Sequence, residues 1–584
     1  MLFKTLCGYF EKIESTSKRL EITAILANII NECSNEDIYQ AVFLSLGTLG
    51  PQYEAIQFNL ADRMVIRILS RTYDVKEESV LSKYKKLGDL GETARLLSAG
   101  RKSSDISVSE IYPQLKQLAF ESGSGSQERK ISLMSLILKD LDEISVKYLV
   151  RIVLGTMRLG FSEITLVEAL SWSNKGDKSF KKRIEDKYRI YPNIGFIAKA
   201  FKEKGFSGIE NIGIEVGVPI LSARCQRVNT AEDIITRHKK SAVEYKYDGT
   251  RIQIHLDRSK RLSGAKGTLL FENERVFVKT YTRNLEESTH MFPDIVEGVL
   301  NSVRAESAIL DCEAIGVDVK TGEFVPFQIT IKRKRKHNVK ELAESIPLKL
   351  VVFDILFYNG QSQIPKPLSE RRGLLEKIVK EDSKVMLAPE SLVDDSVDLM
   401  GIFNEAIKKG LEGIVAKDLN ASYTVGSRGY AWIKFKREET GGLEDTLEPV
   451  VLGYYKGTGQ RSKLGIGAFL VGVLDEKDDS FKTVAKIGTG LTDEQWISLK
   501  NRCDKIKIPE KQKNYVVPKG LSCDVWCEPE ILVAIRSDEI TISPIHSAGY
   551  ALRFPRLIDF RDDISAKDAT TAEELETLHK LWRK

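Results

Sequence analysis

The segment from Glu244 to Arg251 reads EYKYDGTR and places a lysine, an Asp-Gly turn and an arginine close together. A lysine acts as a nucleophile when burial or neighbouring cations lower its pKa and an electrophile is held in line with its amine. The glycine after Asp248 lets the backbone approach a phosphate closely. Arg251 offers a planar fork of donors to phosphate or ribose oxygens. Lys246 is therefore a candidate nucleophile beside a phosphate-binding turn.

Two glutamates, Glu313 and Glu412, stand beside apolar segments that have the character of strands. An unpaired carboxylate in such a place is costly. A divalent cation removes that cost, and Mg²⁺ prefers hard carboxylate oxygens with phosphates completing its shell. Both glutamates are therefore candidate Mg²⁺ ligands.

The sequence K-x-D-G-x-R from Lys246 to Arg251 resembles the nucleotidyl-acceptor motif of covalent nucleotidyltransferases, the polynucleotide ligases and mRNA capping enzymes. Further motifs of that superfamily follow in its order. They are Thr282-Arg283-Asn284, Asp311-Cys312-Glu313, Phe353-Asp354, Glu412-Gly413-Ile-Val-Ala-Lys417 and Trp432-Ile-Lys434-Phe-Lys436. An ordered series of this kind is hard to obtain by chance, so the resemblance implies an enzyme.

The flanking segments narrow the resemblance to ATP-dependent DNA ligases of the archaeal and eukaryotic replicative type. Gly155-Thr-Met-Arg158-Leu-Gly160 and the helices before it are similar to the all-helical DNA-binding domain of those ligases. Arg553-Phe-Pro-Arg556 leads into their last motif. Capping enzymes and RNA ligases usually lack the helical domain. The resemblance covers essentially the whole chain.

The resemblance implies a multi-domain protein. We expect an all-α DNA-binding domain at residues 1–207, a linker at 208–218, an adenylation domain at 219–440 and a C-terminal domain at 441–584. The adenylation domain is expected to be α/β, with an antiparallel, ATP-grasp-like sheet. The C-terminal domain is expected to be an all-β OB-fold barrel that ends in a helix.

The resemblance also implies a role for each motif residue. Lys246 is the expected nucleophile, Phe353 is expected to stack on adenine, and Mg²⁺ is expected at Glu313 and Glu412. We place Lys434 on the α-phosphate and, because Lys434 and Lys436 alternate along a strand, expect them to point to opposite faces. The nucleotide contacts implied by the motifs are Glu244, Arg251, Arg283, Glu313, Phe353, Arg428 and Lys434.

The implied reaction seals nicks in duplex DNA by three transfers. Lys246 attacks the α-phosphate of ATP, AMP passes to the 5′-phosphate of the nick, and the 3′-hydroxyl displaces AMP. The expected partners are nicked duplex DNA and a candidate sliding clamp, for a monomeric ligase of replication, repair and recombination. An RNA ligase or capping-type guanylyltransferase with the same lysine is one alternative. A DNA-binding clamp with weak chemistry is another, although the intact acceptor motif argues against it.

The last motif departs from the family, which usually reads R-x-D-K. Here the residues are Arg561-Asp562-Asp563-Ile564, so an isoleucine replaces the lysine. In related ligases this motif orients the pyrophosphate leaving group during the first step. We expect Ile564 to slow self-adenylation, unless Arg561 alone suffices or Lys567 reaches back in its place.

Composition agrees with a folded protein that has no membrane span. The 584 residues are 42% hydrophobic and 29% charged, and the net charge of 88 − 83 = +5 excludes a histone-like polycation. No signal peptide and no run of 18 apolar residues is found. The seven cysteines are scattered and odd in number, which predicts a reducing, cytoplasmic location. Cys523 and Cys527 lack the partners of a zinc site.

The spacing of apolar residues predicts the elements that must position these side chains. Three- and four-residue spacing predicts helices at Arg19–Cys33 and Lys147–Leu154, with a loop at Ser122–Ser126. Basic residues at Lys332–Lys336 are interpreted as a grip for a phosphate backbone, and Tyr455–Lys463 as a barrel loop facing DNA. A hinge is expected at Glu438–Thr446. Strands are predicted at Val243–His255, Ala308–Val317, Leu348–Phe357, Pro449–Tyr455, Ala468–Leu474, Thr483–Ile487 and Val525–Val533, and helices at Glu370–Val379, Asp395–Lys409 and Ala572–Leu581.

Overall fold

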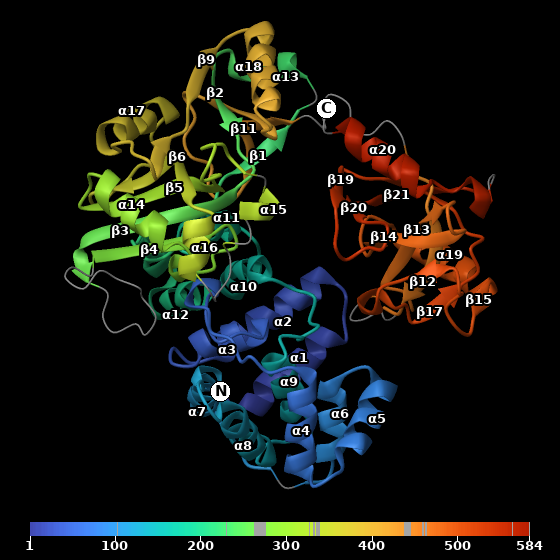
Figure 1. The fold of residues 1–584 in the computed structure, drawn as a ribbon. Helices are drawn as coiled ribbons and strands as arrows, with labels where there is room; N and C mark the ends of the chain where they lie inside the picture. The colour runs from blue at the N-terminus through green and yellow to red at the C-terminus, as the bar shows by residue number, and fades with distance from the viewer. Residues whose placement is uncertain are drawn as a thin grey trace. The chain divides into compact units, whose positions relative to one another are not determined.

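The computed structural model divides the chain into two compact units, Met1–Lys436 and Arg437–Lys584. Figure 1 shows their elements. The structure describes residues 1–101, 103–228, 230–261, 276–325, 327–330, 333, 339–436, 446–457, 461, 464–562 and 565–582. The expected hinge up to residue 445, most of Lys332–Lys336, part of the loop Tyr455–Lys463, and Ile564 lie outside these residues.

The N-terminal half of the first unit is helical, as the sequence predicts. The predicted helix Arg19–Cys33 corresponds to α2, Lys147–Leu154 lies almost wholly in α9, and the Ser-Gly segment separates α7 from α8. The helices are α1 Phe3–Glu14, α2 Arg19–Glu32, α3 Ile38–Leu46, α4 Asp62–Tyr73, α5 Glu77–Leu87, α6 Leu90–Ser98, α7 Val108–Phe120, α8 Ser126–Lys139, α9 Glu143–Val153, α10 Glu163–Lys175, α11 Lys181–Ile190 and α12 Ile194–Glu210. The expected linker at 208–218 therefore begins inside α12, which is kinked at Gly205.

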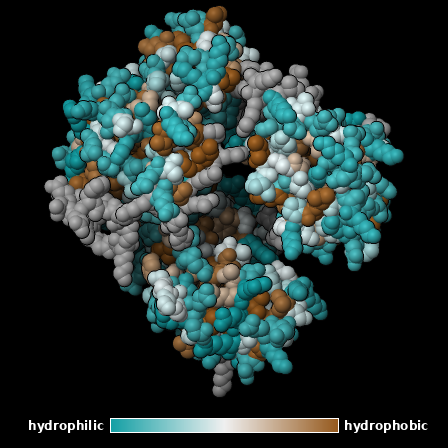
Figure 2. Space-filling model, viewed as in Figure 1, coloured by the Kyte–Doolittle hydropathy of each residue, from teal (hydrophilic) through white to brown (hydrophobic). Residues whose placement is uncertain are grey.

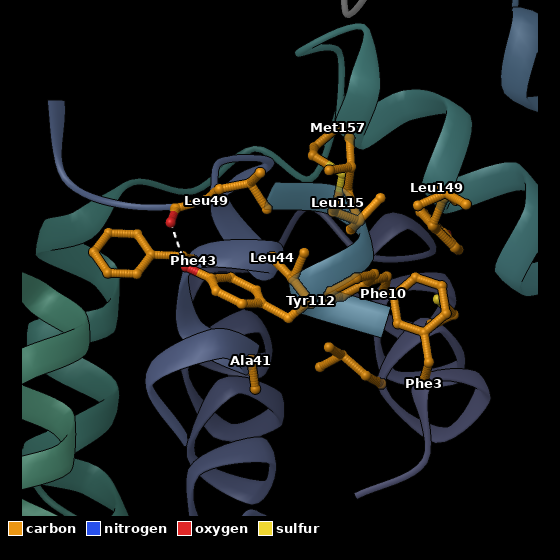
Figure 3. Packing of buried hydrophobic residues seen from close by; sticks show 14 of the residues in the cluster. Phe3, Phe10, Ala41, Phe43, Leu44, Leu49, Tyr112, Leu115, Leu149 and Met157 are labelled. Carbon is orange, nitrogen blue, oxygen red and sulfur yellow. Dashed lines mark hydrogen bonds between the residues drawn. The ribbon is translucent and has the colours of Figure 1, made fainter. Parts of the chain in front are cut away.

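Large apolar side chains hold these helices together. Phe3 and Phe10 of α1 lie in the same buried cluster as Leu115 of α7 and Leu149 of α9, and all four are fully buried (Figure 3). The Tyr112 hydroxyl donates a hydrogen bond to the backbone carbonyl of Leu49. Removing this much apolar surface from water is the main driving force for packing helices that are each too short to be stable alone.

Two sheets follow α12. One has the strand order β4–β3–β5–β6–β7, with β8 beside β6, and the other has the order β1–β11–β10–β2–β9. Most pairs are antiparallel as expected, but β1–β11 and β6–β8 are parallel. The strands are β1 Arg224–Arg227, β2 Ser241–Lys246, β3 Thr250–Arg261, β4 Val276–Thr282, β5 Ser307–Gly316, β6 Leu348–Tyr358, β7 Gln361–Ser362, β8 Val385–Leu387, β9 Glu390–Val393, β10 Gly413–Asp418 and β11 Arg428–Lys436.

Helices accompany these strands in the sequence and pack against them. Leu375 and Ile378 of α17 join the core of the sheet that contains β6, and Leu399 and Phe403 of α18 join the core of the sheet that contains β10. The helices are α13 Ala231–His238, α14 Pro293–Ser302, α15 Phe327–Thr330, α16 Val339–Ser345, α17 Leu368–Ile378 and α18 Ser396–Lys408. The helices predicted at Glu370–Val379 and Asp395–Lys409 are thus α17 and α18.

The second unit is rich in β-structure. Its main sheet has the order β15–β17–β12–β13–β14–β16, and β18–β21 and β19–β20 form separate pairs. The strands predicted at Pro449–Tyr455, Ala468–Leu474 and Thr483–Ile487 correspond to β12, β13 and β14. The structure divides the predicted run Val525–Val533 between β17 and β18. It also contains a helix, α19, that the sequence does not predict. The elements are β12 Val450–Tyr455, β13 Ala468–Asp475, β14 Ser480–Ile487, α19 Asp493–Lys505, β15 Lys507–Ile508, β16 Tyr515–Val516, β17 Val525–Cys527, β18 Val533–Arg536, β19 Glu539–Ile542, β20 Tyr550–Arg553, β21 Arg556–Phe560 and α20 Ala572–Trp582.

The surface seen in Figure 2 is mostly hydrophilic, with hydrophobic residues scattered among the polar ones. Scattered apolar side chains of this kind are normal on folded proteins. Within the described ranges, no helix combines the length and the apolar character that crossing a membrane requires.

Candidate active site

Lys246 lies at the end of β2, where β2 meets β10 and the turn to β3 begins. Gly413 of β10 is its cross-strand partner, so Glu412 comes beside it. Gly249 in the turn and Gly413 both require the absence of a side chain. A Cβ on Gly249 would lie 2.6 Å from the Ala314 carbonyl oxygen, and Gly413 has a φ of +141° against the backbone of β11. The two glycines therefore allow the motif segments to approach each other closely.

The amine of Lys246 is held by a carboxylate. Its Nζ lies 2.5 Å from Oε2 of Glu412, and Nζ of Lys436 lies 2.9 Å from the same oxygen. Burial by itself would lower the pKa of Lys246, but Glu412 and then Glu313 raise it above its ordinary value. The expectation of a lowered pKa is therefore wrong for this state. Burial would raise the pKa of Glu412, but Lys246 and Lys436 lower it to about 2.

Arg251 is fixed by Asp311 of β5, which is fully buried. Its Nε and Nη2 donate to the two carboxylate oxygens of Asp311 at 3.0 and 2.6 Å. The Tyr423 hydroxyl donates to Asp311 Oδ2 at 2.5 Å. The guanidinium carbon also lies 5.4 Å from the ring centroids of both Phe353 and Trp432. The arginine is thus locked at one side of the aromatic pair.

Glu244 and Lys417 form a second buried pair beneath the same rings. Lys417 is 1% exposed and Glu244 4% exposed. Lys417 Nζ donates to Glu244 Oε1 at 2.7 Å and to the Phe353 carbonyl at 3.0 Å, and it lies 4.6 Å from the Trp432 ring centroid. Burial raises the pKa of Glu244 to about 7, although Lys417 lowers it. The motif series contained Lys417 and Trp432, but the candidate residues did not include them.

Glu313 lies on β5 opposite Arg251 of β3. Desolvation raises the pKa of Glu313 to about 8, even though Lys246 and Arg251 act to lower it. In the described part of the chain, no group of three or more His, Cys, Asp or Glu side chains forms a complete metal site. Mg²⁺ is usually held by one or two carboxylates and completes its shell with substrate phosphates and water. Glu313 and Glu412, both close to Lys246, fit that donor set.

Lys434 and Lys436 lie on the same face of β11, so the expectation that they point to opposite faces is wrong. Ile433 and Phe435 are buried, whereas Lys434 and Lys436 are both partly exposed. Residues two apart in a strand share a face. Both lysines are thus on the side of the strand where Lys436 reaches Glu412.

Arg428 and Arg283 lie at the margin of this group. Arg428 is exposed at the start of β11, and Arg283 directly follows β4. Burial and the neighbouring Arg251 and Arg224 lower the pKa of Arg283. The structure thus brings Lys246, Arg251, Glu313 and Glu412 together, with Glu244 and Phe353 beside them in contact with Lys417.

Comparison with known proteins gives the family. Residues 2–171 match the DNA ligase N terminus, 219–436 the ATP dependent DNA ligase domain, and 462–564 the ATP dependent DNA ligase C terminal region. The chain belongs to the ATP-dependent DNA ligase family. The ligase is 42% identical to "Probable DNA ligase" of Dictyoglomus turgidum, over 98% of this chain and 97% of that protein. It is 36% identical to "DNA ligase 1" of the archaeon Methanosarcina acetivorans, over 99% of both chains.

A solved structure named "Pmar-Lig_PreS3" has a similar fold, with a TM-score of 0.57 at 16% identity, over 95% of this ligase and 99% of that chain. The family confirms an ATP-dependent DNA ligase that works through lysyl-AMP, uses ATP and Mg²⁺, and acts on DNA. A helical N-terminal region, a sheet-rich adenylation domain and a β-rich C-terminal domain are confirmed as well. The alternatives of an RNA ligase, a capping-type enzyme and a DNA-binding clamp with weak chemistry are not supported.

Proposed function

We propose that Lys246 forms the lysyl-AMP and that the residues around it bind ATP and then the adenylated nick. The observation that carries this proposal is that the amine of Lys246 lies against Glu412, while Glu313 and the anchored Arg251, which packs on the Phe353 ring, come from the neighbouring strands β5 and β3. The test is a labelling experiment on the intact protein. ATP labelled at the α-phosphate should leave a covalent AMP adduct, and adding nicked duplex DNA should discharge it.

Glu412 and Lys436 prepare the nucleophile. Glu412 holds the amine of Lys246 in place, and the amine must lose its proton before it can attack phosphorus. Because Lys436 contacts the same oxygen of Glu412, that carboxylate keeps a cationic partner when Lys246 turns to the phosphate. Mg²⁺ held by Glu313, Glu412 and the phosphates would neutralise charge on the transferring group.

The remaining candidates are assigned to the nucleotide. Glu244 is proposed to contact the edge of the adenine, and Phe353 is proposed to stack on its face. Arg251 is proposed at the ribose or phosphate oxygens, where its fork geometry suits two acceptors. Lys434 is proposed on the α-phosphate, with Arg283 and Arg428 as further phosphate contacts. The pairs Arg251–Asp311 and Lys417–Glu244 support these assignments because they preset the direction of two side chains.

Removing the ring of Phe353 should weaken ATP binding. Stacking of a base on an aromatic side chain is worth about 1–3 kcal/mol, so Phe353→Ala should lower kcat/KM for adduct formation roughly five- to a hundredfold. Phe353→Tyr keeps the aromatic face and should act nearly as the wild type. Adduct formation at varied ATP concentration measures both. A Phe353→Ala protein that is less stable but has an unchanged KM for ATP would identify the ring as core packing.

We propose the domain limits 1–207, 208–218, 219–440 and 441–584, an ATP-grasp-like adenylation domain and an OB-fold C-terminal domain. The strand pairing of β12, β13 and β14 into an antiparallel meander and the two-sheet adenylation region support this division.

Removing the helical DNA-binding domain should separate the first chemical step from nick binding. A chain that starts at Ile212, after α12, should still form the AMP adduct, because the proposed nucleotide contacts all follow that point. Its affinity for nicked duplex should fall, and the lost affinity should depend strongly on salt, since phosphate contacts release counterions. Adduct labelling and nick binding at two salt concentrations measure these effects. Equal sealing by the truncated and full-length proteins would contradict the assignment.

We further propose a monomer in a reducing cytoplasm, with a sliding clamp as a partner in replication, repair and recombination. The cysteines support the compartment, because all seven are free thiols. Light scattering of the purified protein, alone and with the clamp, tests the oligomeric state and the partner.

A further inference from the structure

The segment Gly217–Ala223, here called the strap, leads from the helical region into β1. Side chains of the adenylation domain bind its backbone at regular intervals. The Gly217 N–H donates to Nδ1 of His255 at 3.0 Å, and the Gly217 carbonyl accepts from the Tyr281 hydroxyl at 2.5 Å. Both polar groups of this residue are therefore satisfied by the domain on which the strap lies.

The same arrangement recurs at two further positions of the strap. The Ile220 N–H donates to Oε1 of Gln253 at 2.7 Å, and the Ile220 carbonyl accepts from Nε2 of Gln253 at 3.2 Å. The Ala223 N–H donates to the Tyr423 hydroxyl at 2.9 Å, and its carbonyl accepts from Nη1 of Arg251 at 2.7 Å.

Three of these side chains come from alternate positions of one strand. Arg251, Gln253 and His255 follow one another along β3 and share a face. Buried polar groups paired in this way resist displacement, because breaking a pair leaves an unsatisfied donor or acceptor. The strap is thus held in register with β3, and its last residue is bound by the arginine proposed to bind the nucleotide.

This placement fixes Arg224, the residue that follows the strap. Arg224 opens β1, its N–H donates to the Ser427 carbonyl at 3.1 Å, and its cross-strand partner in β11 is Arg428. Residues directly opposite each other in a sheet present their side chains on the same face. Both arginines are exposed.

Arg283, which follows β4 of the other sheet, lies near Arg224 and Arg251. It follows Thr282, whose partner in β3 is Ile252, the neighbour of Arg251. The charge of Arg224 contributes to lowering the pKa of Arg283, as expected for cations that lie near each other. We call Arg224, Arg283 and Arg428 the arginine cluster. Among the described residues, no carboxylate lies within ion-pair distance of any of the three.

A group of cations without a counter-charge favours an anion, and guanidinium groups match phosphate oxygens in geometry. We propose that Arg224 binds a phosphate group of the substrate other than the α-phosphate, together with Arg283 and Arg428. The inference rests on the proposed function of the site and adds a residue outside the motif series. The phosphate belongs to the pyrophosphate tail of ATP or to the 5′-phosphate of the nick, which share the same chemistry.

The test uses the full-length protein with Arg224→Ala and Arg224→Lys. Lys240→Ala is the matched control, because Lys240 is an exposed cation that precedes β2, at the opposite end from Lys246. One measurement is the rate of AMP-adduct formation against ATP concentration. The other is single-turnover transfer of AMP from pre-adenylated protein to nicked duplex at fixed salt.

If the site holds the pyrophosphate tail, Arg224→Ala should lower kcat/KM for adduct formation about ten- to a hundredfold and leave the transfer step unchanged. If it holds the 5′-phosphate of the nick, the transfer step should fall by that factor and adduct formation should not. Arg224→Lys should recover part of the loss, because it keeps the charge without the fork. Loss in both steps at unchanged stability would mean that the cluster binds each phosphate in turn.

Rates within about twofold of the wild type in both steps would overturn the proposal. So would an equal loss in both steps accompanied by a lower melting temperature, since the strap is held through its backbone and Arg224→Ala should not destabilise it. A wild-type protein that forms no AMP adduct would instead reject the proposed function itself, whatever Arg224 does.

Discussion

Lys246→Ala and Lys246→Arg should form no AMP adduct. Alanine removes the amine, and the guanidinium of arginine stays protonated and cannot attack phosphorus. Because nothing replaces a missing nucleophile, we expect adduct formation to fall at least about a thousandfold. Labelling with ATP that carries the label on the α-phosphate, followed by denaturing electrophoresis, measures the effect.

Two controls separate lost chemistry from lost structure. Lys246→Ala should still bind nicked duplex, and it should still seal a nick whose 5′ end already carries AMP, because that step needs no lysyl-AMP. Lys436→Ala removes the other amine on the same oxygen of Glu412 and should slow adduct formation without abolishing it. An adduct in Lys246→Ala that peptide mass spectrometry assigns to Lys434 or Lys417 would refute the assignment of the nucleophile.

The sequence predicts the elements well where the apolar pattern is strong. The run Leu348–Phe357 is β6 almost to the residue, since a strand buried on both faces gives a continuous apolar segment. The helix predicted at Arg19–Cys33 is α2 within one residue. In contrast, α19 carries many charged residues and buries only Trp496, Leu499 and Cys503, so its apolar stripe is narrow.

The partners of the site residues could not be predicted in this way. Lys417 and Glu244 are 173 residues apart, and Arg251 and Asp311 are 60 apart. They meet only because β2 pairs with β10 and β3 with β5, and strand order is not encoded in local spacing. The expectation that the pKa of Lys246 is lowered is wrong for the same reason, because the β2–β10 pairing brings Glu412 to its amine. Arg224 carries no motif, and only the strap and the β1–β11 register bring it to the site.

The last prediction concerns two aspartates at the centre of the adenylation domain. Asp311 of β5 and Asp354 of β6 are cross-strand partners, and both are fully buried. Like charges opposite each other destabilise a sheet, but each has its own arginine. Arg251 binds Asp311 through two hydrogen bonds, and Arg371 binds Asp354 in the same way at 2.7 and 3.0 Å.

Asp311→Asn and Asp354→Asn should therefore cost similar stability. Removing one partner of a buried ion pair leaves an uncompensated charge and typically costs about 3–5 kcal/mol in the free energy of unfolding. Urea denaturation of the full-length protein measures this loss. The two variants should differ in chemistry, because Arg251 alone lies in the proposed nucleotide site.

In Asp311→Asn the guanidinium of Arg251 loses its charged anchor. Under conditions in which the variant stays folded, we expect kcat/KM for adduct formation to fall roughly ten- to a hundredfold. Asp354→Asn should keep the wild-type value, since its partner Arg371 is not among the proposed nucleotide contacts. The ratio between the two variants removes the shared loss of stability from the comparison. If both variants lose the same stability and both keep wild-type kcat/KM, Asp311 supports the fold alone, and the position of Arg251 does not depend on it.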